Sequence, residues 1–177
     1  MTDKNKTTKK QTTRKRTRSA PRDVAAPAAE QKSASRQQPE AETAPRQLAV
    51  VPLHVRWRDL DAFNHVNNSS YLTYLEESRL QWLRSVPGEW FNEHSMPVMA
   101  AVELHYRKPI TWPGEIDVEL SCVRIGNSSL TIGNRIVACN NADCVYADGN
   151  VVMVWVDPAT GASVALPKAI RDMVLPG

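Results

Sequence analysis

Residues 59–68 of this chain bring together the side chains best suited to act on a substrate. The segment holds two carboxylates, one imidazole and three carboxamides: Asp59, Asp61, His65, Asn64, Asn67 and Asn68. A carboxylate can serve as a general base toward water or as a nucleophile on an acyl carbon. The unpaired N–H groups and positive dipole end of a following helix can stabilise a carbonyl oxygen. Acyl-transfer chemistry needs both a base and a set of polarising donors, and these residue types could supply them. By themselves they indicate only a polar site next to a helix start.

The two carboxylates need not share one role. Asp59 and Asp61 are two positions apart, so they would point the same way in an extended strand, whereas a turn would separate them. We expect one of them to be a structural cap or an ion-pair partner of Arg56 or Arg58.

The other polar residues of the segment have structural alternatives as well. His65 is a candidate for catalysis, but a turn histidine with satisfied hydrogen bonds has the same appearance in a sequence. Asn67 and Asn68 are candidates for substrate binding, although their residue type and position favour helix capping.

The elements expected around this segment are one strand before it, a long helix after it, and strands beyond. Alternating Leu53, Val55 and Trp57 predict a half-buried strand over residues 48–57. A helix is expected from Ser69 or Ser70 to about Val86, where Pro87-Gly88 stops it. Further strands are predicted at 97–107, 115–125, 130–139 and 144–156, with a terminal helical turn at 167–174. One antiparallel sheet with an apolar face needs a cover, and the lone helix supplies it, so the predicted class is α+β.

The polar segment and its helix resemble a known family. Asp59-Leu60-Asp61-Ala62-Phe63-Asn64-His65-Val66-Asn67-Asn68, followed by Tyr71-Leu72-x-Tyr74-Leu75-Glu76-Glu77-x-Arg79, is similar to the signature of hot-dog-fold acyl-CoA thioesterases of the 4-hydroxybenzoyl-CoA thioesterase type. His105-Tyr106-Arg107-Lys108-Pro109 also resembles the second strand and turn of that family. The resemblance covers about Val51 to Val174.

This resemblance implies a fold, an activity and an assembly. The implied hot-dog fold wraps a strongly bent antiparallel sheet around one central helix. The implied reaction is hydrolysis of acyl-CoA thioesters, with Asp61 as catalytic carboxylate and backbone N–H groups at the helix start polarising the carbonyl. Sites would lie at the interface of a homodimer or homotetramer, and no metal or organic cofactor is implied. Many relatives have Gly where Asn64 stands, and Asn tolerates the positive φ that such a turn requires.

Four more residues are candidates for substrate binding. Phe63 suggests an apolar lining near the acyl group. Tyr71 is placed to touch substrate at the helix start, or to pack against the sheet. Arg107 and Lys108 could meet the phosphates of CoA, or form a solvated charged pair at a strand end.

Charge and composition divide the chain into two parts. Residues 1–46 hold 12 of the 22 Lys and Arg and 5 of the 19 Asp and Glu, a net charge of +7, whereas residues 47–177 carry −4. The first part has no aromatic residue, and we expect a disordered basic, then Ala- and Pro-rich, tail that serves solubility or contacts nucleic acid or an anionic membrane. Residues 47–177 are expected to form the catalytic domain.

Three cysteines without a C-x-x-C pair, no secretory signal and no membrane-spanning apolar run favour a cytoplasmic protein. The alternative functions are a hot-dog hydratase or dehydratase, or a non-catalytic acyl-CoA-binding protein whose tail binds nucleic acid. The hydratase motif, which contains proline, is absent from Asp61–His65, and the tail shows no helical apolar period.

Overall fold

The computed structural model of the protein describes residues 45–175. These residues belong to one compact unit of the chain, Ala41–Gly177. The disordered tail expected over residues 1–46 therefore lies outside the described residues, except at its last two positions. Arg46, expected at the end of that tail, is already the first residue of a strand.

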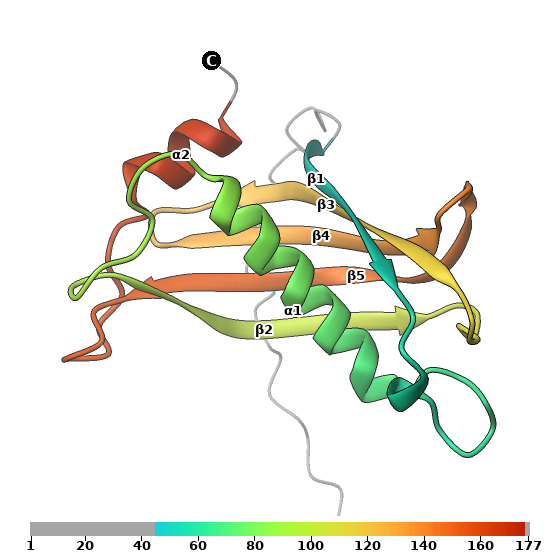
Figure 1. The fold of residues 1–177 in the computed structure, drawn as a ribbon. Coiled ribbons are helices and arrows are strands. Elements are labelled where there is room, and N and C mark those ends of the chain that lie inside the picture. Colours follow the sequence, from blue (N-terminus) through green and yellow to red (C-terminus); the bar gives the residue numbers. More distant parts are fainter. Residues whose placement is uncertain (1–44, 176–177) are drawn as a thin grey trace, which may run out of the picture. The chain divides into compact units, whose positions relative to one another are not determined.

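The described part contains five strands, two α-helices and one short 3-10 helix (Figure 1). They are β1 (Arg46–His54), η1 (Trp57–Asp59), α1 (Asn68–Ser85), β2 (Met96–Tyr106), β3 (Glu115–Ile125), β4 (Ser129–Ala138), β5 (Asn141–Val156) and α2 (Lys168–Val174). The strands form one antiparallel sheet in the order β1-β3-β4-β5-β2. The predicted α+β class and the long helix over an antiparallel sheet are confirmed.

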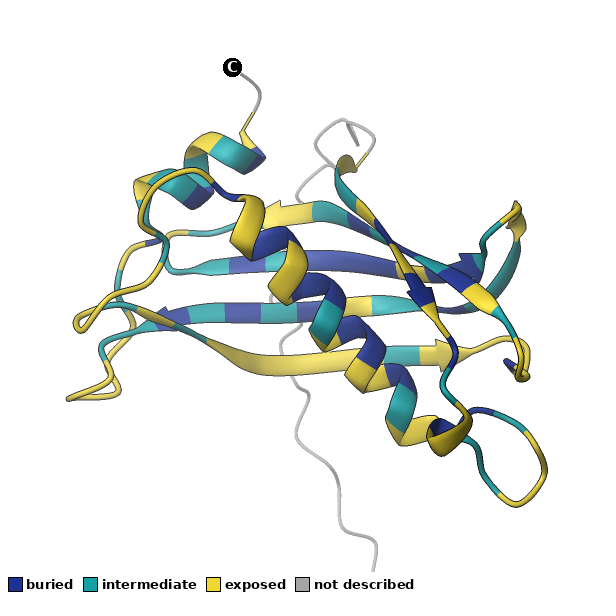
Figure 2. Ribbon diagram, in the orientation of Figure 1, coloured by how far each residue is buried: buried dark blue, intermediate teal, exposed yellow. Residues whose placement is uncertain are grey.

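Helix α1 crosses one face of the sheet diagonally (Figure 1). Its inner side carries residues at helical spacing, among them Tyr74, Leu75 and Trp82, each at most 1% exposed. They pack on the alternating inner residues of the central strands, such as Ile132 of β4 and Val151 of β5. Figure 2 shows this buried layer between α1 and the sheet.

The limits of most predicted elements differ from the sequence-based prediction by a few residues, and two of these differences have a clear local cause. The first strand ends at His54 instead of Trp57, because the chain turns into η1, and Trp57 is 72% exposed. Helix α1 begins at Asn68, one residue before the expected start, because Asn67 caps it. Its end at Ser85 agrees with the stop expected from Pro87, which disfavours a helical residue before it.

The two edges of the sheet are β1 and β2. Within the described residues strand β2 is hydrogen-bonded only to β5, and all of its 11 residues are exposed or partly exposed. It nevertheless carries several large apolar side chains: Met96, Val98, Met99, Val102 and Tyr106. A long apolar edge strand of this kind is a template for pairing with another chain.

Candidate active site

The loop between η1 and α1 is built around the side chain of Asp61. Its Oδ1 accepts hydrogen bonds from the backbone N–H groups of Phe63, at 2.8 Å, and His65, at 3.1 Å. The Asp61 backbone N–H donates to the carbonyl of His65 at 2.7 Å, which closes the loop. In the described part of the chain Oδ2 of Asp61 has no hydrogen-bond partner. One carboxylate oxygen thus orders the loop while the other stays available.

The tight turn of this loop depends on Asn64. Its φ is +62°, in the left-handed region that most residues with a side chain avoid. The positive φ expected for Asn64 is confirmed. A second fastening comes from the backbone N–H of Val66, which donates to the carbonyl of Ile110 at 2.8 Å. The loop is therefore held against the segment that follows β2.

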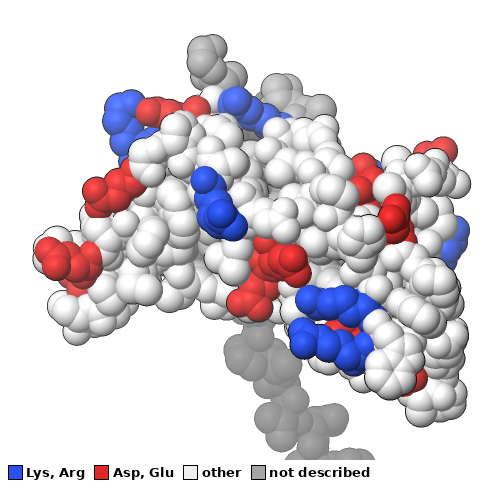
Figure 3. Space-filling model, in the orientation of Figure 1, with Lys and Arg blue, Asp and Glu red and all other residues white. Residues whose placement is uncertain are grey.

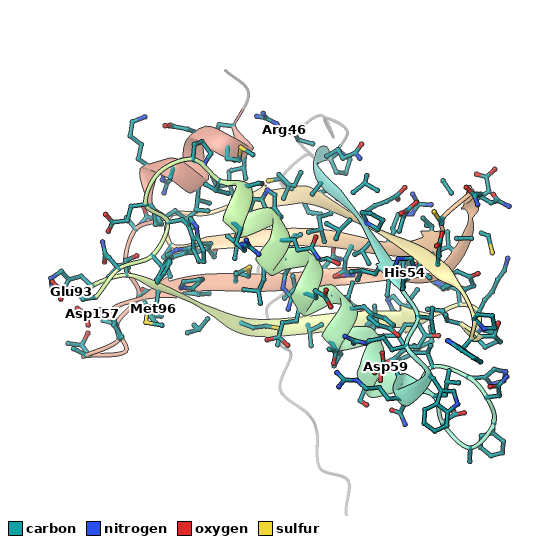
Figure 4. The ribbon with its side chains drawn as sticks, in the orientation of Figure 1. Arg46, His54, Asp59, Glu93, Met96 and Asp157 are labelled. Carbon is teal, nitrogen blue, oxygen red and sulfur yellow. The ribbon has the colours of Figure 1, made fainter. Side chains whose placement is uncertain are left out.

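Asp59 is the structural carboxylate of the pair. It is 8% exposed, and its Oδ2 accepts hydrogen bonds from Arg56 Nε at 2.7 Å and from the Tyr74 hydroxyl at 2.8 Å. The guanidinium of Arg56 also lies 5.3 Å from the centre of the Tyr74 ring. Figure 4 labels Asp59 beside the start of α1, and Figure 3 shows basic side chains gathered around acidic ones there. The expectation that one aspartate pairs with Arg56 is confirmed.

These contacts set the protonation of Asp59 and Tyr74. Burial by itself would raise the pKa of the Asp59 carboxyl, but the hydrogen bonds from Arg56 and Tyr74 outweigh burial and lower it below the ordinary value. Burial and the hydrogen bond to Asp59 raise the pKa of Tyr74 to about 12. At neutral pH Asp59 is therefore an anion held by two donors, which locks η1 onto α1.

The start of α1 offers one backbone donor to a ligand. Asn67 caps the helix, because its Oδ1 accepts from the Ser69 N–H at 3.0 Å, and its carbonyl accepts from the Ser70 N–H at 2.8 Å. The Asn68 N–H, at the first helical position, has no acceptor among the residues that the structure describes. It is the donor that could polarise a carbonyl oxygen.

A cleft of about 290 Å³ brings most of the expected site residues together. Its lining comes from the loop, the helix start and the segment after β2: Asp61, His65, Val66, Asn68, Tyr71, Tyr106, Arg107, Lys108 and Pro109. The imidazole of His65 has no hydrogen-bond partner in the described residues. Asp61 and His65 therefore face one cavity, as the sequence-based hypothesis requires.

Two expected substrate-binding residues lie outside this cleft. Phe63 is at the tip of the loop and 80% exposed. Asn67 faces the helix end that it caps and does not line the cleft. Within one chain Phe63 therefore does not contact the cleft, so it cannot form the apolar lining for an acyl group that was expected of it there.

A pair of tyrosines forms one wall of the cleft. The buried Tyr71 hydroxyl accepts from the Ile110 N–H at 3.2 Å and faces the Lys108 carbonyl at 3.4 Å. Tyr106 donates to the Asn68 carbonyl at 3.1 Å, and its ring meets that of Tyr71 edge-on at 5.0 Å. Sequence reasoning left Tyr106 out of the site, although its place directly before the two basic residues was a usable signal.

The two basic residues at the cleft differ in availability. Arg107 makes a bidentate pair with Asp148, Nε to Oδ2 at 2.7 Å and Nη2 to Oδ1 at 2.9 Å. That hydrogen bond raises the pKa of Arg107 and lowers the pKa of Asp148. Lys108 is exposed, its Nζ lies 3.8 Å from Cys144 Sγ, and no carboxylate in residues 45–175 lies within 4.0 Å of it. Lys108 is therefore the freer cation for a phosphate.

Two negative findings concern the described residues alone. They contain no group of three His, Cys, Asp or Glu side chains arranged to hold a metal ion. None of their helices combines the length and apolar character that crossing a bilayer requires.

Comparison with known proteins finds a family and several relatives similar to this chain. The sequence profile of the thioesterase-like superfamily matches residues 55–174. The long-chain acyl-CoA thioesterase FadM of Escherichia coli is 26% identical over 122 residues, which cover 68% of this chain and 92% of FadM.

Two solved structures have a higher sequence identity. A candidate acyl-CoA thioesterase from Xanthomonas campestris is 47% identical, with a TM-score of 0.60, over 64% of this chain and 96% of that one. A thioesterase from Thermus thermophilus, solved with coenzyme A and Zn, is 34% identical, with a TM-score of 0.60, over 71% and 90%.

Proposed function

Because the chain belongs to the thioesterase-like superfamily, we propose that it hydrolyses acyl-CoA thioesters to a free acid and CoA, with Asp61 as catalytic carboxylate. The named relatives support the reaction, since FadM is a long-chain acyl-CoA thioesterase. The observation that carries the assignment to Asp61 is the unpaired Oδ2 of this side chain, because Asp61 lines the same cleft as Asn68, whose N–H also has no acceptor in the described residues.

In the proposed reaction the thioester carbonyl oxygen accepts a hydrogen bond from the Asn68 N–H, next to the positive end of α1. This donor stabilises the negative charge that develops on the oxygen when the carbonyl carbon is attacked. As a general base, Asp61 takes a proton from water while the water oxygen bonds to the acyl carbon. The C–S bond then breaks, and the CoA thiolate leaves and takes up the proton.

A nucleophilic route gives the same products. Asp61 Oδ2 bonds directly to the acyl carbon, CoA leaves, and water then hydrolyses the mixed anhydride. Single turnover in water enriched with heavy oxygen separates the two. The general-base route puts the label only in the acid product, whereas water attack on the Asp61 side of an anhydride labels the protein.

For binding of CoA we propose Lys108 as the main phosphate contact, with Arg107 in a secondary role. The guanidinium of Arg107 is already compensated by Asp148, so a phosphate would have to compete with that carboxylate. His65 and Tyr71 border the thioester position, and His65 is proposed to position the attacking water.

The acyl group is proposed to bind where two copies of the chain meet. Strand β2 offers an unpaired edge with exposed apolar residues, and pairing with a second β2 about a two-fold axis would cover it. Antiparallel pairing lays the last residues of one β2, next to its cleft, beside the first residues of the other. Met96, labelled in Figure 4 at the far end of the molecule from Asp59, would then approach the partner's cleft. A homodimer, or a homotetramer built from it, would complete the site.

The decisive experiment is a free-thiol release assay across a panel of acyl-CoAs, with wild type and Asp61→Asn measured side by side. We expect wild type to release CoA and Asp61→Asn to lose about 100-fold or more in kcat. Asp143→Asn is the matched control, because Asp143 is an exposed aspartate that does not line the cleft. Absence of thiol release with every acyl-CoA would refute the proposed reaction, and full turnover by Asp61→Asn would refute the assigned residue.

The assembly is tested by Val98→Lys, which puts a charge on the apolar edge without touching the cleft. Light scattering should show an oligomer for wild type and a monomer with little turnover for the variant. A monomeric wild type with full activity would contradict the shared site. The cytoplasmic location expected from the sequence stays a prediction.

A further inference from the structure

A second hollow lies between α1 and β2, away from the cleft. This groove has a volume of about 450 Å³, within the range of small-molecule sites. Most of its lining is apolar, from Leu72 and Leu83 of α1 to Met99 and Val102 of β2. Its lining includes residues of β2, the edge strand that the proposed pairing brings beside the cleft of a second copy.

One cation lines this mostly apolar groove. Arg79 of α1 is 8% exposed, and its Nη2 lies 4.0 Å from the sulfur of Met99, a weak acceptor. Across residues 45–175, no carboxylate oxygen lies within 4.0 Å of its guanidinium nitrogens. The other buried ionised residue of the described part is Asp59, and it has charged partners.

A largely buried guanidinium without an oxygen partner is unfavourable, because most of its contact with water is lost and no hydrogen bond to a protein oxygen replaces it. Burial accordingly lowers the pKa of Arg79, and the charge of Glu76 opposes that shift. Glu76 also lines the groove, but it is exposed to solvent and forms no ion pair with Arg79. The Arg79 guanidinium therefore has donors to offer, and in residues 45–175 no oxygen accepts a hydrogen bond from it.

We propose that Arg79 selects acyl groups whose far end carries an oxygen acceptor, a hydroxyl or a carboxylate, and that this end binds in the groove. This inference rests on the proposed thioesterase function. An apolar channel with one placed donor is the usual composition of a specific small-molecule site. The apolar part of the acyl group would cover Leu72, Met99 and Val102, and its oxygen would accept from Arg79. A plain acyl chain would leave the guanidinium unpaired.

The test uses acyl-CoAs that differ only at the far end. For each chain length from hexanoyl to dodecanoyl, kcat and KM are measured for the plain, ω-hydroxy and ω-carboxy acyl-CoA. In wild type we expect kcat/KM to favour at least one oxygen-bearing form by about 10-fold or more at a suitable length, since hydrogen bonds to charged groups are strong. The hydroxy and carboxy series tell the two kinds of oxygen apart.

Substitutions then assign the preference to Arg79. Arg79→Met should reduce the ratio to about one, through KM more than kcat, and Arg79→Lys should restore part of it. Arg84→Met is the control, because Arg84 is an exposed residue of the same helix outside the groove. The oligomeric state of each variant is measured in parallel.

Three results would overturn the proposal. Equal kcat/KM for plain and oxygen-bearing chains in wild type would do so without any variant, and it would leave the thioesterase function intact. An unchanged ratio in Arg79→Met would remove Arg79 from selectivity. If Arg79→Met dissociated into monomers and lost activity equally toward all substrates, the partner of Arg79 would be a second copy of the chain and not the acyl group. Failure of every acyl-CoA would instead refute the underlying function.

Discussion

Asp59 and Asp61 are two residues apart in the sequence and have opposite surroundings. Asp59 is buried, and both Arg56 and Tyr74 donate to its Oδ2. Asp61 uses Oδ1 to order its own loop and leaves Oδ2 unpaired at the cleft. The same side chain thus serves to fasten a helix in one place and to face a substrate site in the other.

The difference shows how this protein separates stability from chemistry. A buried carboxylate that accepts from a guanidinium stabilises the fold but is a poor base, because the cation favours its charged form and substrate cannot reach it. A carboxylate that lines a cleft and accepts only from backbone N–H groups is less stabilising and can be reached by substrate. The first can hold the second in place because η1 and the loop are consecutive.

The largest effect is expected from substitutions of Asp61. Asp61→Asn keeps an oxygen for the loop N–H groups, so turnover should fall about 10²–10⁴-fold with little change in unfolding free energy. Asp61→Ala should lose as much activity and also about 1 kcal/mol of stability, because the Phe63 and His65 N–H groups lose their acceptor. Kinetics and denaturant unfolding measure the two effects. If Asp61→Asn unfolds as easily as Asp61→Ala, the carboxylate is mainly structural.

Asp59→Asn should show the reverse pattern. Loss of the anion leaves Arg56 without its closest partner, which we expect to cost about 2 kcal/mol of unfolding free energy, because Asp59 is buried but Arg56 is partly exposed. The folded fraction should retain turnover. Asp148→Asn is the control, because its pair with Arg107 is exposed and should contribute less than about 1 kcal/mol. Equal destabilisation by both variants would show that burial of Asp59 is not decisive.

Lowering the pH should reduce the unfolding free energy through protonation of Asp59, by less than the substitutions above do. The folded state lowers the pKa of Asp59, so its contribution is complete above the unfolded value, about 3.9, and is lost as pH falls through the lower folded value. Unfolding free energy measured from pH 6 to pH 2 should therefore drop less in Asp59→Asn than in wild type. Parallel curves for the two proteins would disprove a lowered pKa.

Asn64 forms the tight turn of the loop that Asp61 orders. Asn64→Ala should cost about 1 kcal/mol, because a φ of +62° is strained for Ala, whereas Asn64→Gly should be close to neutral. Thermal unfolding of the two variants gives the comparison. A stable Asn64→Ala would mean that the loop can relax to another conformation.

The smallest effect is expected from deletion of residues 1–44. Because β1 begins at Arg46, this truncation keeps every described strand. The unfolding free energy should change by no more than about 0.5 kcal/mol, and the turnover rate should stay nearly the same. The Arg46 guanidinium, which donates to the Leu175 carbonyl, is retained. Loss of binding to nucleic acid or anionic vesicles on deletion would give the basic segment a role of its own.

Local pattern accounts for much of the architecture. Helical spacing of apolar residues located α1, and Asn67 and Pro87 bracket it, because caps and proline act through neighbouring backbone groups. Alternating residues located the strands to within a few positions. The main error, Trp57 at the end of the first strand, arose because the 3-10 turn is held by tertiary contacts of Asp59 that alternation cannot reveal.

The residue types and spacing of positions 59–68 indicated by themselves only a polar site before a helix, and the similarity of this segment to a family suggested the reaction. Contacts with α1 and β2 determine which aspartate is buried and which helix amide stays unpaired. They also place Tyr106 at the border of the site. Arg79 likewise looks like an ordinary helix residue until the fold buries it. The types and spacing of reactive residues that are neighbours in the chain can be taken from the sequence. Burial and pairing depend on segments that only folding brings together.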